Sequence, residues 1–478
     1  MPSPRRYFIL RIHGASSRNP LKPCACILLA GLCQAFAQNY VLPPAHVQNQ
    51  QTGTPQSNLG PVPAVLTFRD ALARAQSYET QFLAAVNAAS VAHEDTAQAR
   101  DALYPLFGVR SEYLNTQGNG KVPSGRFVTN DGIHVYREWA TVHQDLSPGT
   151  LSGVAVQRAA AQEAIARARV EIARRGLAVT VTKAYYGLVN AQHKYATAQL
   201  GRDQAQHSLS ISQDLERGGE VAHSDVVKAQ LQLNAQEQAL QEARLGMDTA
   251  RLDLAVLLSS DLNQNFQVVD DLQTTSALLP FPDIRTLAQR QNPDVRVAME
   301  DLRSARTDVT LARQAYLPTV TVDLVWGIEA NQIGWNTVVA AAPQLGPLPS
   351  AGYFLTGALS LPVWDWGARR SKLRQAELKR DLATVEVTNA QRQLLRNLAA
   401  DYAEAQAARS ELDLLRQSTD LATENLRLNG LRYQAGEATI LELVDAENTL
   451  NQARNAYDDG LVRYRMALAT LQTLTGPF

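Results

Sequence analysis

The sequence has no cysteine outside one short N-terminal segment, which holds all three of its cysteines, Cys24, Cys26 and Cys33. We therefore expect that no disulfide bond holds the folded part of the chain together. Charge of one sign is not in excess, because 45 lysines and arginines face 46 aspartates and glutamates. This balance gives no indication of a nucleic-acid partner. Aromatic residues amount to only 6%, and stretches dominated by alanine, glutamine, leucine and arginine are typical of long packed helices.

The signatures of common catalytic and metal sites are also missing. The sequence contains no GxSxG, HExxH, Walker A or CxxC motif. No two of its histidines stand at metal-ligand spacing on an expected helix. The histidines beyond the N-terminal segment are His46, His93, His134, His143, His193, His207 and His223. We therefore predict no enzyme activity, no cofactor and no metal site.

Long hydrophobic runs are absent as well. The apolar stretch Cys24–Phe36 follows a basic segment and ends in a small-x-small pattern at Ala35–Ala37, which predicts a signal peptide over residues 1–37. This stretch is shorter than the ~20 residues that a membrane-spanning helix needs. A lipid anchor at Cys33 remains the open alternative. Residues 38–66, rich in proline, glutamine and asparagine, predict an extended linker.

Similar segments recur at a fixed distance along the chain. Gly219–Gln230 aligns with Gly436–Glu447 at an offset of 217 residues, and Ala99–Pro105 aligns with Ala312–Pro318 at an offset of 213. Self-similarity of this kind is the sequence signature of a repeated structural unit. We therefore predict two tandem copies.

The predicted copies cover residues 67–272 and 283–478, and a linker over 273–282 joins them. Each copy begins with one helix, near 68–103 and 283–316, followed by two short strands. A long helix follows, over 150–216 and 367–434, and then a glycine turn and a last helix of about 40 residues.

The last helix of each copy carries apolar and small residues at alternating spacings of four and three. In the second copy these residues are Ala446, Leu450, Ala453, Tyr457, Gly460, Tyr464, Ala467, Leu471 and Leu474. In the first copy they are Ala229, Leu233, Gln236, Leu240, Ala243, Met247, Ala250, Leu254 and Leu257. A heptad seam of this kind predicts left-handed supercoiling. A helix of some 67 residues would be ~100 Å long, so it must pack in a bundle or tube.

Four short stretches alternate between apolar and polar residues, as strands do. They are 107–113, 134–145, 319–326 and 353–361, each about as long as a strand that crosses a membrane. All five tryptophans lie in or beside them, as interfacial aromatic residues would: Trp139, Trp326, Trp335, Trp364 and Trp366. A soluble sheet with a buried core is the alternative, but its edges would be exposed. A closed barrel needs more strands than one chain has. The loops 115–133 and 330–351 would then face outside the cell.

The segment Leu431–Asn448 resembles the "RY-x-x-G-x-x-x-x-x-x-x-x-A-E" signature of the TolC-type outer-membrane efflux channel family. Leu361–Gly367 resembles the same family's proline-glycine transition between barrel and tunnel. The resemblance implies a mainly α protein with a membrane β-barrel, in which three chains give four strands each to one twelve-stranded barrel. The long helices form a periplasmic α-barrel. The homotrimer would sit in the outer-membrane lipid of a Gram-negative bacterium.

The resemblance also implies a function and a set of partners. The channel would be the exit duct of a tripartite efflux or type I secretion system. An inner-membrane pump of RND or ABC type would deliver substrates through a periplasmic adaptor protein. The sequence does not indicate the substrate, the pump class or the resting state of the tip.

The resemblance places the family's functional positions near the helical turns. Glu442 and Asp445 match the acidic pore constriction, one helical turn apart. Asp225 and Tyr433 match residues that hold the tip shut, although Ala438 stands where the family often has a basic partner. The turns expected to contact the adaptor contain Gly218, Gly219, Ala435 and Gly436, and the expected membrane-interface aromatics are Trp139, Trp326, Trp364 and Trp366. Solvated charge and ordinary turn chemistry are the simpler interpretations.

Two rival interpretations remain. A periplasmic coiled-coil adaptor or interaction protein would have one helical hairpin and a soluble β domain. An exported enzyme with a helical body would need a pocket with catalytic residues, and none is recognisable in the sequence.

Overall fold

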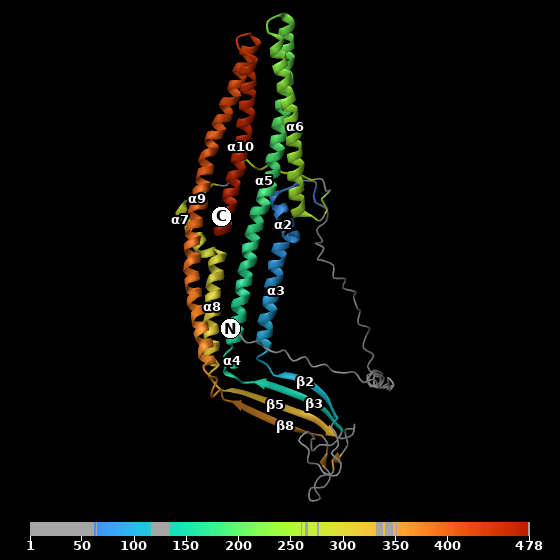
Figure 1. The fold of residues 1–478 in the computed structure, drawn as a ribbon, viewed down its shortest axis with the longest axis vertical. Coiled ribbons are helices and arrows are strands. Elements are labelled where there is room, and N and C mark those ends of the chain that lie inside the picture. The colour runs from blue at the N-terminus through green and yellow to red at the C-terminus, as the bar shows by residue number, and fades with distance from the viewer. Residues whose placement is uncertain are drawn as a thin grey trace, which may run out of the picture. The chain divides into compact units, whose positions relative to one another are not determined.

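Long helices and one four-stranded sheet make up most of the chain in this computed structural model (Figure 1). The structure describes residues 62–63, 65–115, 134–259, 261–262, 266–274, 277–330, 338–339, 348–349 and 351–476. Residues Leu59–Phe478 form one compact unit. The predicted signal peptide, nearly all of the predicted 38–66 linker, most of both predicted external loops, and Trp335 lie outside the described residues.

The same order of elements occurs in the first and the second half of this unit. The first half contains α2 (Phe68–Tyr78), α3 (Thr80–Asp101), β2 (Leu106–Asn115), β3 (His134–Asp145), α4 (Pro148–Leu151), α5 (Val154–Gly218) and α6 (His223–Leu258). The second half contains α7 (Phe281–Gln291), α8 (Pro293–Gln314), β5 (Thr319–Ala330), β8 (Ala351–Ser360), α9 (Ala368–Gln434) and α10 (Ile440–Thr475). The long helices α5 and α9 have 65 and 67 residues, and α6 and α10 have 36 each, so the predicted helices and strands are confirmed.

The first helix of each half is broken in two, which corrects the prediction of single helices over 68–103 and 283–316. Glu79 and Asn292 stand at the breaks with extended backbone, at φ −72° and ψ 121° and at φ −69° and ψ 122°. Each side chain caps the helix that follows, because Glu79 accepts from the amides of Gln81 and Phe82 and Asn292 accepts from the amide of Val295. Pro293 adds a second cause, since the residue before a proline avoids the helical region.

The end of the predicted 38–66 linker belongs to the fold. Strand β1 (Val65–Leu66) pairs in parallel with β4 (Gln267–Val268). The hydroxyl of the buried Tyr185 donates to the carbonyls of Leu66 and Val269, at 3.1 and 2.8 Å, and thereby ties both strands to α5. Pairings of two residues over 200 positions apart leave no periodic signal, and the sequence therefore predicted only an extended segment here. Helix α7 likewise begins at Phe281, inside the predicted 273–282 linker.

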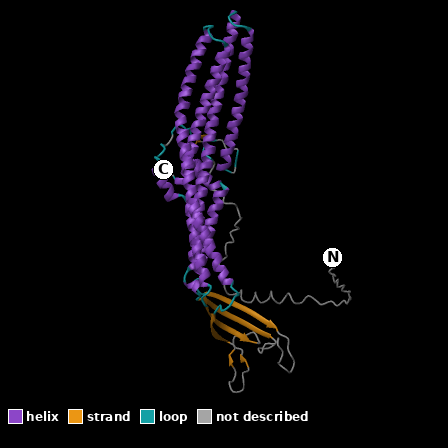
Figure 2. Ribbon diagram, turned by 60° about the vertical axis from the view of Figure 1, so that its left-hand side comes forward, coloured by secondary structure: helices purple, strands orange, loops and turns teal. Residues whose placement is uncertain are grey.

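Strands from both halves form a single antiparallel sheet in the order β2-β3-β5-β8. Trp139 of β3 lies opposite Gly327 of β5, where a Cβ atom would stand 2.0 Å from the backbone oxygen of Glu138. Only glycine allows this close approach. A further short pair, β6 (Val338–Val339) with β7 (Leu348–Pro349), lies in the connection between β5 and β8. The sheet lies at the end of the helices opposite to the α5–α6 and α9–α10 turns (Figure 2).

Helix α5 is the element that joins the two halves, because it packs on α6, on α8 and on α10. The predicted heptad seam of α10 is confirmed where it faces these helices, since Ala446, Leu450, Tyr464 and Leu471 are buried. In α6 the seam is buried at Ala229, Leu233 and Leu254, and half-buried from Gln236 to Ala250 and at Leu257. No helix within the described ranges is both long and apolar enough to cross a membrane.

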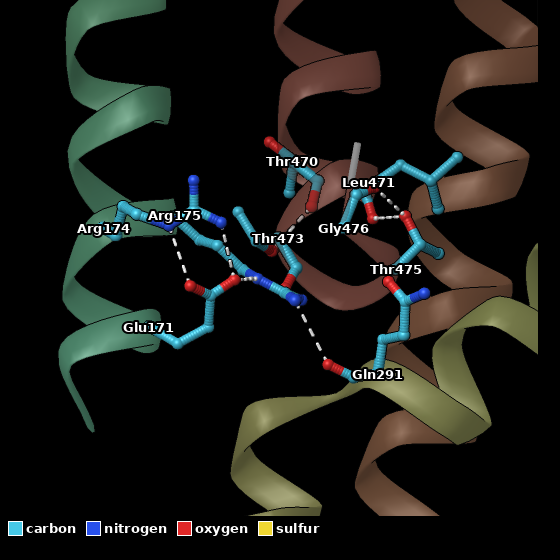
Figure 3. A network of polar contacts seen from close by, with 9 residues as sticks. All are labelled: Glu171, Arg174, Arg175, Gln291, Thr470, Leu471, Thr473, Thr475 and Gly476. Atoms are coloured by element: carbon cyan, nitrogen blue, oxygen red, sulfur yellow. Dashed lines mark hydrogen bonds and ion pairs between the residues drawn. The ribbon is translucent and has the colours of Figure 1, made fainter. Parts of the chain in front are cut away.

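One half-buried arginine, Arg175, connects α5 to the second half (Figure 3). The guanidinium of Arg175 donates to the carbonyls of Thr473, near the end of α10, and Gln291, at the end of α7, at 2.8 and 3.2 Å. It also pairs with Glu171 at 2.6 Å. Arg174 and Arg175 together hold the pKa of Glu171 at about 2. A cation at two helix C-termini meets carbonyls that lack a helical partner.

Candidate functional site

Two helical turns form the tip of the molecule, and each depends on one glycine. Gly219 follows α5 at φ 78°, and Gly436 lies in the turn after α9 at φ 74°. This left-handed conformation ends helices and favours glycine, because a side chain would be strained there. The predicted turn residues Gly218, Gly219, Ala435 and Gly436 are all exposed. Both turns are therefore accessible to a partner.

A core shared by four helices lies directly behind the turns. It is made of Ala205 and Leu209 of α5, Ala229 and Leu233 of α6, Tyr433 of α9, and Ile440 and Leu443 of α10. Because every tip helix contributes to this core, one turn cannot move away from the other without exposing apolar side chains.

The predicted constriction residues Glu442 and Asp445 lie in the first two turns of α10, and both are exposed. The carboxylate of Glu442 already has partners in its own chain. It forms a capping box with Thr439 and an ion pair with Arg432 of α9 at 3.2 Å. Hydrogen bonds from Thr439 and the charge of Arg432 lower the pKa of Glu442. Asp445 has no ion pair among the residues that the structure describes. Of the two carboxylates, Asp445 is therefore the one without a compensating cation from the described part of its own chain.

The predicted tip contacts Asp225 and Tyr433 do not bond to one another in this chain. Tyr433 is fully buried, and its hydroxyl lies 2.7 Å from Oγ of Ser212 on α5. Asp225 pairs instead with Lys228 of its own helix at 3.1 Å. Burial is the largest cause that raises the pKa of Tyr433, and the charge of Asp225 adds to it. Tyr433 thus holds α9 to α5 through a serine, which sequence reasoning missed.

A second buried contact stands one helical turn from the first. Glu447 of α10 is only 4% exposed, and its Oε1 accepts from Oγ of Ser208 at 2.6 Å. Its other oxygen, Oε2, has no hydrogen-bond partner. The carboxylate lines a cavity of about 200 Å³ together with Gln204 and Arg454. Burial raises the pKa of Glu447, partly offset by hydrogen bonds from Ser208 and Gln204.

Ser208 and Ser212 thus form a pair on α5 that reaches both helices of the second hairpin. Glu447 lies inside the segment Leu431–Asn448 that resembles the family signature, but the sequence analysis assigned it no role. Its exposed counterpart at the offset of 217 is Gln230. The only signal that could have singled it out is a carboxylate beside the heptad position Ala446.

A third polar link between the halves lies further along α5. Nδ1 of His193 lies 3.1 Å from Asp458 of α10, and Nε2 lies 2.7 Å from Asp270 after β4. The two carboxylates, Asp458 first, raise the pKa of His193 to about 9. In the described part of the chain, no cluster of three or more His, Cys, Asp or Glu side chains could hold a metal ion.

Of the predicted interface aromatics, Trp364 and Trp366 are the most exposed, and their rings meet edge to face at 5.7 Å. Trp326 is half exposed within β5. Trp139 is half-buried, with the guanidinium groups of Arg110 and Arg137 against its ring at 5.9 and 5.4 Å. All four lie in the sheet or beside its end at the helices.

Comparisons with known proteins place this arrangement among known folds. The crystal structure of the CmeC outer membrane channel of Campylobacter jejuni superposes with a TM-score of 0.71 at 18% identity, over 86% of this chain and 85% of CmeC. A membrane protein from Pseudomonas aeruginosa gives a TM-score of 0.73 at 19% identity, over 86% of this chain and 92% of that one. The fold of the chain is therefore that of outer-membrane channels.

Sequence comparison leads to the same family. Outer membrane protein OprJ of Pseudomonas aeruginosa is 25% identical over 67% of this chain, an alignment that spans 65% of OprJ, less than two thirds of its length. Outer membrane protein TolC of Escherichia coli is 22% identical over 80% of this chain and 77% of TolC. The family model for outer membrane efflux proteins matches residues 284–477. The resemblance inferred from the sequence is thereby confirmed: residues 284–477 match the outer membrane efflux protein family, and the relatives found over a larger part of the chain are outer membrane proteins, among them TolC.

Proposed function

We propose that this chain is one subunit of a homotrimeric outer-membrane channel, the passive exit duct of a tripartite efflux or type I secretion system. Substrates would arrive from an inner-membrane pump, of RND or ABC type, through a periplasmic adaptor. The channel itself would carry out no catalysis. In this proposal residues 67–272 and 283–478 are tandem copies of one unit, which the shared order and nearly equal lengths of their main helices support.

The observation that carries the proposal is the incomplete sheet. Within the described residues, β2 and β8 each pair on one side only. Both strands are 10 residues long, and their side chains are largely exposed and apolar. Such edges attract further strands unless they are covered, and a membrane requires a closed barrel. Three chains that give four strands each would close a barrel of twelve.

The helices offer a second surface for neighbouring chains. Helix α6 packs on α5, and α9 packs on α10 and α8, so α6 and α9 lie on opposite sides of α5 and α10 (Figure 1). Exposed leucines recur on both at multiples of seven: Leu231, Leu245 and Leu252 on α6, and Leu414, Leu421 and Leu428 on α9. Heptad seams without a partner favour packing between chains. We infer that α6 of one subunit contacts α9 of the next.

The proposal assigns roles to the tip. Asp445 and Glu442 of three subunits would form the acidic constriction, with Asp445 contributing most of the uncompensated charge. Asp225 and Tyr433 belong to the region that holds the tip shut, and the turns with Gly218, Gly219, Ala435 and Gly436 would contact the adaptor. The aromatic residues Trp139, Trp326, Trp364 and Trp366 would lie near the lipid interface.

One preparation tests the proposal as a whole. The protein should be recovered from outer membranes in detergent, with the mass of a trimer, heat-modified gel mobility and single-channel conductance in planar bilayers. A monomer that stays in solution without detergent would contradict it. That outcome would favour the rival periplasmic adaptor, although the two helical hairpins of this chain do not fit the single hairpin expected of an adaptor.

The constriction has a separate test. Asp445→Asn should weaken the block of conductance by divalent cations more than Glu442→Gln does, because Arg432 already compensates Glu442. Asp420→Asn, on the exposed surface of α9, removes one carboxylate elsewhere and should leave the block unchanged. Equal effects of all three substitutions would show that total charge, and not the constriction, governs the block.

A further inference from the structure

A basic and aromatic patch covers the place where the sheet meets α9. It consists of Val363, Trp364, Trp366, Arg370, Lys372 and Arg374, which we call the collar patch. The three apolar side chains are 87%, 75% and 90% exposed, an unusual concentration of bare apolar surface. The basic residues follow within the first two turns of α9 and are also exposed.

A tight turn holds the two tryptophans in place. Asp365 accepts hydrogen bonds from the amides of Gly367 and Arg369, at 3.1 and 2.8 Å, and from Nε of Arg369 at 2.7 Å. Arg369 donates in turn to the carbonyl of Pro362 at 2.7 Å. Trp366 has φ 54° and is the only described residue other than glycine with a positive φ. A bulky residue in this conformation is strained, and such strain often marks a functional position.

The positive charges of the collar patch are available to bind a ligand, because strong ion pairs within the described part of the chain do not neutralise them. Neither Arg370 nor Lys372 has an acidic side chain within ion-pair distance among the described residues. Arg374 stands 3.8 Å from Glu377 and is 72% exposed, so this pair is weak. Arg370 to Arg374 span about 6 Å of helix, within the Debye length of ~8 Å in physiological salt. Arg370 and Arg374, one helical turn apart, therefore act together on a nearby anionic surface, and Lys372 adds a charge at the same height on the other side of α9.

The first half of the chain enters its long helix without such a patch. The equivalent positions, aligned on Gly153 and Gly367, are Gly149, Thr150, Ser152, Val156, Arg158 and Ala160. The single cation among them, Arg158, pairs with Asp308 at 2.9 Å. The transition from strand to helix therefore does not require tryptophans or free cations, and the collar patch needs another explanation.

We propose that the collar patch binds the headgroups of anionic phospholipids at the membrane surface from which the helices emerge. This inference rests on the proposed function, in which the strands cross the membrane. Tryptophans prefer the headgroup level, where ring and N–H are both accommodated. Arginine and lysine bind phosphate, and their long stems can lie along the apolar Val363 and Trp364.

Reconstitution of the full-length protein tests this inference. The triple variant Arg370→Gln, Lys372→Gln, Arg374→Gln removes three charges from the collar patch. Arg392→Gln, Arg396→Gln, Arg409→Gln removes three exposed charges further along α9 and is the matched control. The wild type and both variants are reconstituted into vesicles of phosphatidylcholine alone or of phosphatidylcholine with added phosphatidylglycerol. The readout is quenching of tryptophan fluorescence by brominated phosphatidylglycerol, compared with brominated phosphatidylcholine.

The wild type and the control should prefer phosphatidylglycerol, and the collar variant should lose about fivefold in this preference for each charge removed. Equal loss in both variants, or full retention in the collar variant, would overturn the inference while insertion still supports the proposed function. Failure of the wild type to enter either kind of vesicle would overturn both. Trp366→Phe keeps an aromatic ring and should retain most of the phosphatidylglycerol preference. Because this variant lacks the fluorescence of Trp366, the decrease in quenched emission shows how much of the signal comes from Trp366.

Discussion

The turn between α5 and α6 and the turn between α9 and α10 have the same backbone but are held by different side chains. Both contain a glycine in the left-handed region, and both last helices begin from nearly the same N-cap conformation, φ −80° and ψ 152° at Ala222 and φ −87° and ψ 158° at Thr439. The second turn adds a capping box, the Arg432–Glu442 pair and the buried Tyr433. The first turn has none of these, so we expect it to open more readily.

The largest expected effect comes from the buried tyrosine. Tyr433→Ala empties the four-helix core behind the turns and should lower the free energy of unfolding by about 3–5 kcal/mol. Its counterpart at the offset of 217, Glu216, pairs only with His223 at the surface, so Glu216→Ala should cost less than about 1 kcal/mol. Denaturant unfolding of the detergent-solubilised protein measures both. Similar losses would mean that the two turns are equally held.

Exchanging the N-caps should reduce the difference between the turns. Thr439→Ala removes the capping box and should cost about 1 kcal/mol. Ala222→Thr should gain a similar amount, because Asp225 already stands at the third helical position, where Glu442 completes the box in α10. Hydrogen–deuterium exchange of the first-turn amides in α6 and α10 reports each change locally. A destabilising Ala222→Thr would show that the first turn does not have the backbone of the second.

The buried carboxyl should make the second hairpin sensitive to pH. Burial raises the pKa of Glu447 above its usual 4.5, so the packed tip favours the protonated form. The contact should be strongest below pH 4.5 and weaken as the pH rises through the raised pKa. Glu447→Gln should abolish this slope in amide exchange near Ser208, whereas Gln230→Glu at the exposed equivalent position should introduce none. If the slope persists in Glu447→Gln, another titratable group causes it.

The smallest difference between the two turns is expected from a change at His193, because the polar link that it forms joins the two hairpins. His193 of α5 is held protonated by Asp458 and Asp270, with a pKa of about 9. Its stabilisation should be complete below pH 6.5 and be lost as the pH rises through about 9. Thermal unfolding between pH 7 and 10 should show this loss in the wild type and not in His193→Gln. Both turns should respond alike, since the link joins α5 to α10.

Much of this architecture follows from local patterns in the sequence. The heptad spacing of Leu450 and Leu471 and the alternation of Val320 and Leu324 depend on neighbours three, four or two residues apart, and both patterns predicted the observed elements. The break at Asn292 also had a local signal, the following proline, which the longer helical pattern outweighed.

Contacts between the halves were not predictable in the same way. Ser208 and Glu447, 239 positions apart, meet only because of how α5 and α10 are rotated against each other, and a single sequence does not show this rotation. The same holds for Tyr433, whose partner turned out to be Ser212. For Trp364 and Trp366 the sequence indicated an interface, but the left-handed turn that holds them depends on hydrogen bonds from Asp365 and Arg369.

The arginine joint on α5 has a mechanical consequence. Arg175 donates hydrogen bonds to carbonyls at the ends of α7 and α10. The part of α5 between Arg175 and Gly218 is about 65 Å long at 1.5 Å per residue. A helix of that length converts a small change of its tilt at Arg175 into a large displacement of its far end. In the proposed channel, a tilt of about 5° of the packed helices at this point would displace the distant turns by about 6 Å over that length.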